Sequence, residues 1–318
     1  MGDRTGIQWT DATWNPVTGC SKVSPGCANC YAETVAKRFP EKFTDDGTFR
    51  PWTPENTGHN VLLHPDRLDQ PLRWTRPRMV FVNSMSDLFH DDVPAEFIAE
   101  VFAVMAAAPT HTFQLLTKRP ERMQAVVGSP LFRNVVEAKL AALIRGGAAA
   151  PPDYLAGTWP LLNVWLGVSI ENRRYVDRAD VLRATPADVR FISAEPLIGP
   201  VVYDRWTGDP GHQVHGSWLD VYDGPQLDLT NIDWLIVGGE SGPDARTMDL
   251  AWVRALRDAC AASGTAFFMK QLGTRLAAGL ASRKGDDPDE WPEDIRVRQM
   301  PDLYRQRWML GPTQAGPS

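Results

Sequence analysis

Residues 78–117, RMVFVNSMSDLFHDDVPAEFIAEVFAVMAAAPTHTFQLLT, contain the pattern that best indicates the class of the fold. Two apolar runs, 78–84 and 112–117, flank a segment with helical periodicity at 94–108. Pro94 suits the first turn of a helix and Pro109 stops it. Because both runs are almost continuously apolar, they resemble parallel strands that are buried on both faces. The stretch therefore predicts one βαβ unit.

The same alternation extends along the chain in both directions. Further strands are predicted at 12–17, 164–169, 189–195, 234–240 and 265–271, and further helices at 30–39, 119–127, 135–145, 171–184 and 250–263. Seven strands that alternate with helices indicate an α/β fold, a parallel βα barrel or partial barrel, with a doubly wound open sheet as the alternative.

The segments that interrupt this alternation are rich in proline, glycine, aspartate and tryptophan. We expect a barrel domain over residues 1–272 with loop insertions at about 40–77, 146–160 and 196–233. Residues 273–318 are expected to form a C-terminal extension whose acidic stretch, 284–294, is exposed.

Composition and charge narrow the class of protein. The chain has 318 residues, is 43% hydrophobic and carries a net charge of -6. This charge disfavours binding of long duplex DNA through its phosphates, but it allows a small molecule or a few nucleotides as substrate. Residues 1–15 lack the apolar core of a signal peptide, and no apolar run has membrane-spanning length. We therefore expect a cytoplasmic protein with no membrane partner.

Three of the four cysteines lie within TWNPVTGCSKVSPGCANCYAE, residues 13–33. Cys20, Cys27 and Cys30 are too crowded for a disulfide scaffold and indicate a metal-binding or catalytic loop. Glycines before two of them and a proline between them allow the backbone to turn tightly. The fourth cysteine, Cys260, shares a helix face with Val253 and Leu256 and is predicted to be a core residue.

A trio of thiolates without a fourth ligand suits a [4Fe–4S] cluster with one open iron. A structural zinc site needs four protein ligands, which His59, His64 or His90 could complete. A loop of incidental thiols is the third interpretation. The spacing alone leaves these alternatives open, because cysteine-rich loops serve both metals.

Polar side chains recur where the predicted strands end. Since active sites of βα barrels gather at the carboxyl ends of the strands, this recurrence predicts a functional mouth. The residues concerned are Ser86, Asp87, Lys118, Arg119, Ser169, Glu171, Asn172, Glu195, Glu240 and Lys270.

At these residues the chain resembles the radical S-adenosylmethionine superfamily. More closely, it is similar to a phage- and prophage-associated family of uncharacterised three-cysteine-motif proteins related to that superfamily. The segments that carry the resemblance are TGIQWTDATWNPVTGC (5–20), GCANCYAE (26–33), LLTKRPERM (115–123), LGVSIEN (166–172), FISAEPL (191–197), VGGESG (237–242) and FFMKQLG (267–273).

The resemblance implies a partial barrel in which Cys20, Cys27 and Cys30 hold a [4Fe–4S] cluster. S-adenosylmethionine would bind the open iron and, on reduction by an external electron donor, be cleaved to a 5′-deoxyadenosyl radical that abstracts hydrogen from the substrate. It further suggests a nucleotide or nucleic acid as the substrate to consider first, and a partner protein encoded in the genomic neighbourhood.

Roles for individual residues follow from position and from the resemblance. Ser86 and Asp87 are expected at the cofactor amino group, Ser169, Glu171 and Asn172 at the ribose, and Tyr31 and the backbone of Gly238 at the adenine. Lys118 and Arg119 are expected to bind a phosphate or carboxylate of the substrate. Glu195, Glu240 and Lys270 are the catalytic candidates, since carboxylates and amines transfer protons.

The sequence also departs from the superfamily pattern. The cysteine spacing is six then two rather than three then two, Asn29 stands where an aromatic residue is usual, and NSMSD (83–87) takes the place of the glycine-rich cofactor motif. Two other functions stay in view: a zinc-stabilised phage protein that binds nucleic acid or protein without catalysis, and a metal-independent barrel enzyme that uses Glu195, Glu240 and Lys270 as acid and base.

Overall fold

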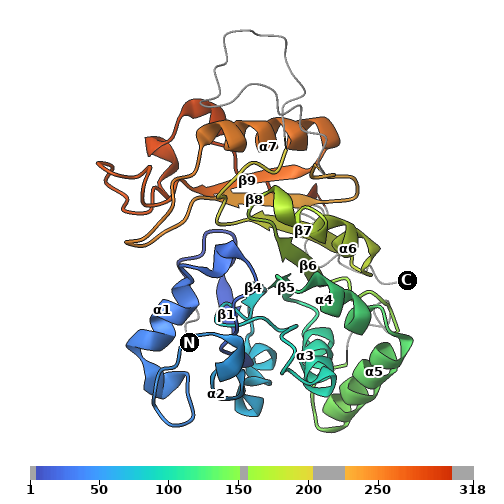
Figure 1. Cartoon of the computed structure of the whole chain (residues 1–318). Helices are drawn as coiled ribbons and strands as arrows, with labels where there is room; N and C mark the ends of the chain where they lie inside the picture. The colour runs from blue at the N-terminus through green and yellow to red at the C-terminus, as the bar shows by residue number, and fades with distance from the viewer. Residues whose placement is uncertain (1–4, 151–156, 203–225, 303–318) are drawn as a thin grey trace, which may run out of the picture.

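Seven parallel strands form one curved sheet in the computed structural model, which describes residues 5–150, 157–202 and 226–302 (Figure 1). The strands are β1 (Ala12–Trp14), β4 (Met79–Val82), β5 (Thr112–Thr117), β6 (Val164–Ser169), β7 (Val189–Ala194), β8 (Trp234–Gly238) and β9 (Ala266–Gln271). Their order in the sheet is β1-β4-β5-β6-β7-β8-β9. Because this order follows the chain without reversal, the sheet curls into a half-barrel and is not doubly wound.

Helices connect most of these strands. They are α1 (Tyr31–Arg38), α2 (Thr57–Asn60), α3 (Ala95–Ala107), α4 (Pro120–Val127), α5 (Pro130–Arg145), α6 (Arg178–Ala184) and α7 (Leu250–Ser263). Local signals set several ends: Ser129 accepts a hydrogen bond from the Phe132 amide at the start of α5, and Asp249 does so from Ala251 at the start of α7. Gly264, with φ of 75°, ends α7 in the left-handed conformation.

Side chains of the strands alternate between two apolar layers. Val80 and Val82 of β4 face the helices and pack in the larger core cluster, whereas Phe81 points into the half-barrel. The inner layer is largely aromatic and consists of Trp9, Met79, Phe81, Trp165, Val189, Phe191, Trp234, Ile236 and Phe268. The half-barrel is therefore filled with side chains at its base and leaves space only at the carboxyl ends of its strands.

All seven predicted strands are confirmed, with local differences. The run 12–17 is broken at Pro16, which lacks an amide hydrogen for the ladder. The chain then leaves the main sheet, and β2 (Val17–Thr18) pairs antiparallel with β3 (Leu62–Leu63) inside the insertion 40–77. The helix predicted at 135–145 begins earlier, at Pro130, because Ser129 caps it.

The predicted helix 171–184 is wrong over its first turns. Residues Arg173–Tyr175 form a 3-10 turn capped by Asn172, and α6 begins only at Arg178. The break leaves Glu171 fully buried below the turn, where Arg178 folds back to bind it. The other 3-10 turns are Pro25–Cys27, Pro40–Lys42, Pro54–Asn56, Pro65–Arg67, Gln70–Arg73, Pro288–Glu290 and Glu293–Ile295.

The described part of the C-terminal extension packs along the outer edge of β9. The Met269 amide donates to Val297 O at 2.8 Å, and the Gln299 amide donates to Phe267 O at 2.8 Å. Trp291 is 2% exposed, so the expectation that 284–294 is exposed is wrong at this position. Its indole donates to Gly285 O at 2.8 Å and anchors the segment, while the backbone of residues 297–299 covers the β9 edge.

Parts of two predicted insertions (151–156 and 203–225) and the end of the extension (303–318) lie outside the described residues. Within the described ranges, no helix is long and apolar enough to cross a membrane.

Candidate functional site

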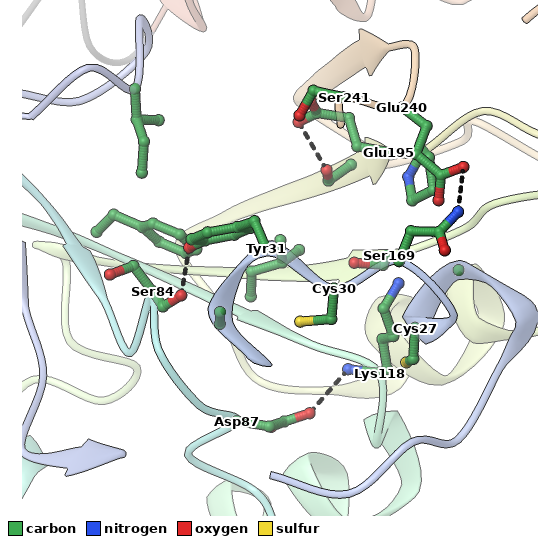
Figure 2. Close-up of a pocket in the computed structure, with 18 of the residues that line it drawn as sticks. Cys27, Cys30, Tyr31, Ser84, Asp87, Lys118, Ser169, Glu195, Glu240 and Ser241 are labelled. Atoms are coloured by element: carbon green, nitrogen blue, oxygen red, sulfur yellow. Dashed lines mark hydrogen bonds between the residues drawn. The ribbon is translucent and has the colours of Figure 1, made fainter. Parts of the chain in front are cut away.

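A cavity of about 520 Å³ opens at the carboxyl ends of the strands, above the aromatic layer. Its volume lies in the range typical of small-molecule and cofactor sites. Most of the predicted site residues line it: Cys20, Cys27, Cys30, Tyr31, Ser86, Asp87, Lys118, Arg119, Ser169, Glu195, Glu240 and Lys270. Glu171, Asn172 and Gly238 do not. Figure 2 shows part of this wall, with Cys30 between Asp87 and Glu195 and Cys27 beside Lys118.

The cysteine loop, residues 19–30, follows β1 and β2 and crosses the mouth of the half-barrel. Its first residue requires glycine: Gly19 has φ of 83°, and a Cβ there would lie 1.6 Å from Asn60 O. The Gly19 amide donates to Met85 O at 2.9 Å, and Ser86 Oγ donates to Val17 O at 2.8 Å. Ser86 therefore fastens the entry of the loop to the end of β4.

The three thiols open to one cavity, and those of Cys20 and Cys27 contact separate partners. Cys20 Sγ contacts Ser21 O at 3.4 Å and accepts from Arg119 Nη1 at 3.5 Å, while Cys27 Sγ lies 3.8 Å from Ser24 Oγ. Among the described residues, no group of three or more histidine, cysteine, aspartate or glutamate side chains is arranged to hold a metal ion.

Histidine does not complete a ligand set on this wall. In the described part of the chain no histidine lines the cavity. His64 Nε2 is bound to Thr18 Oγ1 at 2.8 Å, His90 Nε2 is bound to Ser21 Oγ at 2.8 Å, and His59 is exposed on α2. Without histidine, the potential metal donors on this wall are the three thiols and the carboxylates of Asp87, Glu195 and Glu240.

Burial and neighbouring charges set the protonation of the thiols. Burial, and to a lesser extent Asp87, raise the pKa of Cys20 to about 12 against the opposing Arg119 guanidinium. Burial also raises the pKa of Cys30, which the amides of Glu33 and Ala32 at the first turn of α1 oppose. Cys20 and Cys30 are therefore neutral thiols in the metal-free loop, and a bound cation would be needed to favour their thiolates.

Asp87 and Arg119 form a buried ion pair beneath Cys20. The Asp87 carboxylate accepts from Arg119 Nη1 at 3.1 Å and from Thr117 Oγ1 at 2.8 Å. Arg119 Nη2 donates to Ser21 O at 3.1 Å and to Ser21 Oγ at 3.0 Å. Arg119, 8% exposed, is thereby committed to the cysteine loop, although its edge reaches the cavity.

Glu171 supports the middle of the loop from below. It is fully buried, forms a very short ion pair with Lys118 and lies 3.3 Å from Arg178 Nη1. Ser24 Oγ donates to it at 2.6 Å, and Gly26 lies so close that an added Cβ would be 2.4 Å from Oε1. Burial alone would raise the pKa of Glu171, but Lys118, Ser24 and Arg178 together lower it below its usual value.

Glu240 holds the far end of the loop. Its carboxylate forms a bidentate pair with Arg246, accepts from the Arg246 amide at 2.8 Å and accepts from Asn29 Nδ2 at 3.1 Å (Figure 2). Asn29 Nδ2 also donates to Asp244 O at 2.8 Å. Burial would raise the pKa of Glu240, but the hydrogen bonds from Arg246 and Asn29 lower it.

Glu195 and Lys270 form the remaining charged pair of the wall. The Glu195 and Lys270 side chains meet at 2.7 Å and are 14% and 22% exposed, and among the described residues they make no hydrogen bond or ion pair with the cysteine loop. Ser193 Oγ donates to Glu195 Oε2 at 3.1 Å. This pair comes from the ends of β7 and β9 and faces the cavity opposite the cysteines, so it is available to a ligand.

The other predicted residues take varied places. Tyr31 is 52% exposed at the rim and donates a very short hydrogen bond to Ser84 O, and Ser169 lies in the cavity wall. Asn172 caps the 3-10 turn at Arg173–Tyr175. Gly238 makes room for Glu195, whose Oε1 would lie 2.6 Å from an added Cβ.

Sequence reasoning did not single out Asn83 for a role. It follows β4, lines the cavity, has φ of 60° and is 3% exposed, and neither atom of its amide has a hydrogen-bond partner among the described residues. Such strain combined with unsatisfied polarity is typical of ligand contacts. Its place at the end of a predicted strand was visible in the sequence, but its conformation was not. The linking roles of Asn29, Ser24, Arg178 and Arg246 left no sequence signal.

Comparison with known proteins gives one match. No curated protein and no solved structure matches the chain. One family model, described as "Protein of unknown function (DUF5131)", matches residues 4–301. This span covers the half-barrel, the cysteine loop and the described C-terminal extension. The chain therefore belongs to the DUF5131 family.

Proposed function

We propose that this protein is an iron–sulfur enzyme of the radical S-adenosylmethionine type. Cys20, Cys27 and Cys30 would hold a [4Fe–4S] cluster, and the cavity beside them would bind the cofactor together with a small substrate. The observation that carries the proposal is that three cysteines, without a described histidine or fourth cysteine, line one 520 Å³ cavity at the mouth of a parallel half-barrel.

When bound, a cluster with an open iron supplies the electron that cleaves S-adenosylmethionine. The chain's own residues bind and orient. The Arg119 guanidinium at Cys20 and the amides of α1 at Cys30 stabilise negative charge on the sulfurs. Two further requirements, an external electron donor and the exclusion of water during the reaction, come with this chemistry.

The half of the cavity opposite the cysteines suits the substrate. Glu195 and Lys270 offer an acceptor and a donor side by side, and Ser169 and Ser193 add hydroxyls. Because the Glu195–Lys270 pair is partly exposed to the cavity, a substrate can exchange hydrogen bonds with it without breaking the core. Asn83, at the end of β4, adds an unused donor and acceptor that the cofactor can reach in the same cavity. A nucleotide-sized substrate with several polar groups fits these features.

Anaerobic purification followed by iron and sulfide analysis tests the proposal. The expected result is a brown protein with about four irons per chain, which releases 5′-deoxyadenosine from S-adenosylmethionine after reduction. Replacement of Cys20, Cys27 or Cys30 by alanine should abolish both, whereas Cys260→Ala should abolish neither, because Cys260 is buried in α7 away from the cavity.

Two outcomes would contradict the proposal. A colourless protein with one tightly bound zinc would support the zinc-stabilised binding protein instead. A metal-free protein whose activity survives loss of the cysteines but not of Glu195 or Lys270 would support acid–base catalysis in the same cavity.

A further inference from the structure

We propose that Glu240 is a positioning residue that acts through Asn29 to hold Cys30 at the cavity. This inference rests on the proposed function, because it concerns the loop that would hold the cluster. The position of the loop itself can be measured without any metal. The carboxylate sits at the end of β8, and the contact to Asn29 joins residues 211 positions apart in the chain.

The hydrogen bonds of Glu240 engage most of its carboxylate with protein donors. A carboxylate has about four lone-pair sites, two on each oxygen. Oε2 accepts from Asn29 Nδ2 and from the amide and Nε of Arg246, and Oε1 accepts from Arg246 Nη2. These four donors crowd Oε2 and leave one site on Oε1, and the side chain is only 5% exposed. The main role of the Glu240 carboxylate is therefore to hold Asn29 and Arg246 together.

The same arrangement recurs on alternate strands. Asp87 after β4, Glu171 after β6 and Glu240 after β8 are each paired with a cation, and each is linked to the cysteine loop. Asp87 reaches Cys20 and Ser21 through Arg119, Glu171 binds Ser24, and Glu240 binds Asn29. The end of β5 supplies two of the paired cations, Lys118 and Arg119, whereas the ends of β7 and β9 present Glu195 and Lys270 to the cavity. Side chains from alternate strands of a βα barrel share a layer, which fits the recurrence of the three supporting carboxylates on β4, β6 and β8.

Each support acts on a different part of the loop. Asn29 is adjacent to Cys30, whereas Ser24 lies three residues from Cys27, with its Oγ 3.8 Å from that sulfur. Loss of the Glu240–Asn29 contact should therefore free Cys30 more than Cys20, which Arg119 and Ser21 continue to hold.

The test measures alkylation of each cysteine by iodoacetamide in the folded, metal-free protein, resolved by mass spectrometry. In Asn29→Ala and Glu240→Gln we expect Cys30 to react about tenfold faster, as loss of a charge-assisted hydrogen bond implies, with Cys20 changed less than twofold. Ser24→Ala should shift the effect to Cys27. Asp294→Asn, which removes an exposed partner of Arg254, is the matched control and should change none of the rates.

Asn29→Asp separates positioning from simple packing. It preserves size but replaces the donor with a second negative charge beside Glu240, so it should free Cys30 at least as much as Asn29→Ala. If Asn29→Asp behaves like the wild type, or if Cys30 reactivity is unchanged in Glu240→Gln, the inference is wrong. The alkylation measurement needs no cluster. A wild-type protein that binds no iron would therefore refute the proposed function, whereas the cysteine reactivities would still test this inference.

Discussion

Replacement of Glu171 by glutamine should destabilise the whole protein, because it removes a fully buried carboxylate that lies between two cations. Glu171 is fully buried, while its partners Lys118 and Arg178 are 19% and 9% exposed. Breaking a buried ion pair by removing one partner costs about 3–5 kcal/mol. Lys118 can turn toward the cavity and regain water, whereas Arg178 stays bound to Ser169 O at 2.7 Å. We therefore expect the lower end, about 3 kcal/mol.

This loss converts to a measurable shift in Tm. The entropy of unfolding is about 2.1 cal/mol/K per residue, so for a chain of 318 residues it is about 0.67 kcal/mol/K. Glu171→Gln should thus lower Tm by about 4–5 °C at pH 7, measured by circular dichroism or calorimetry. The matched control is Glu137→Gln, whose side chain is 48% exposed in a surface pair with Arg133 and whose loss should cost about 1 °C or less.

The pH dependence provides the sharper check. Because the folded-state pKa of Glu171 lies below its usual value of 4.5, its contribution is complete above pH 4.5 and is lost as pH falls through the lower folded value. The Tm difference between wild type and variant should be constant from pH 7 to 5 and narrow below 4.5. A Glu171→Gln protein within 1 °C of wild type at pH 7, or a difference that widens in acid, would refute the reasoning.

Three further substitutions probe the site. Gly19→Ala should prevent the cysteine loop from packing, because the added Cβ would overlap Asn60 O. Limited proteolysis should then cut within residues 19–30. The control Gly47→Ala adds its Cβ in open space and should not promote cleavage. Asn83→Gly should weaken S-adenosylmethionine binding about tenfold in equilibrium dialysis, because a donor and an acceptor for the ligand are lost. The Tm should stay the same or rise, because the substitution removes two unpaired buried polar atoms and the strain of a left-handed backbone. Unchanged affinity would exclude Asn83 as a ligand contact. Lys270→Met should reduce turnover at saturating cofactor at least tenfold with normal iron content, and a loss of iron instead would assign Lys270 to the loop.

The tertiary structure reassigned several residues that position alone made candidates for ligand binding. Arg119 and Glu171 follow strands, as residues that bind ligands do. Their side chains are instead hydrogen-bonded to the cysteine loop, at Ser21 and Ser24. Glu240 was a catalytic candidate because it ends a predicted strand at the mouth, and its carboxylate is instead bound to Arg246 and Asn29. Glu195 and Lys270 kept an open face. Sequence position thus located the mouth of the half-barrel, but it did not distinguish residues that hold the cysteine loop from residues that are open to a ligand.

Local chemistry alone determined the strands, most helices and the place of the site. Apolar runs, prolines and helix caps act over a few residues, and a parallel order brings every strand's carboxyl end to one edge, so the cysteine loop and the polar strand ends had to meet there. The sequence likewise determined that Cys260 is a core residue, because its neighbours share one helical face. Only the tertiary structure decided which charged side chains pair, that Trp291 is buried against the β9 edge, and that Asn83 is left unpaired. These depend on distances between residues far apart in the chain, which no local pattern records.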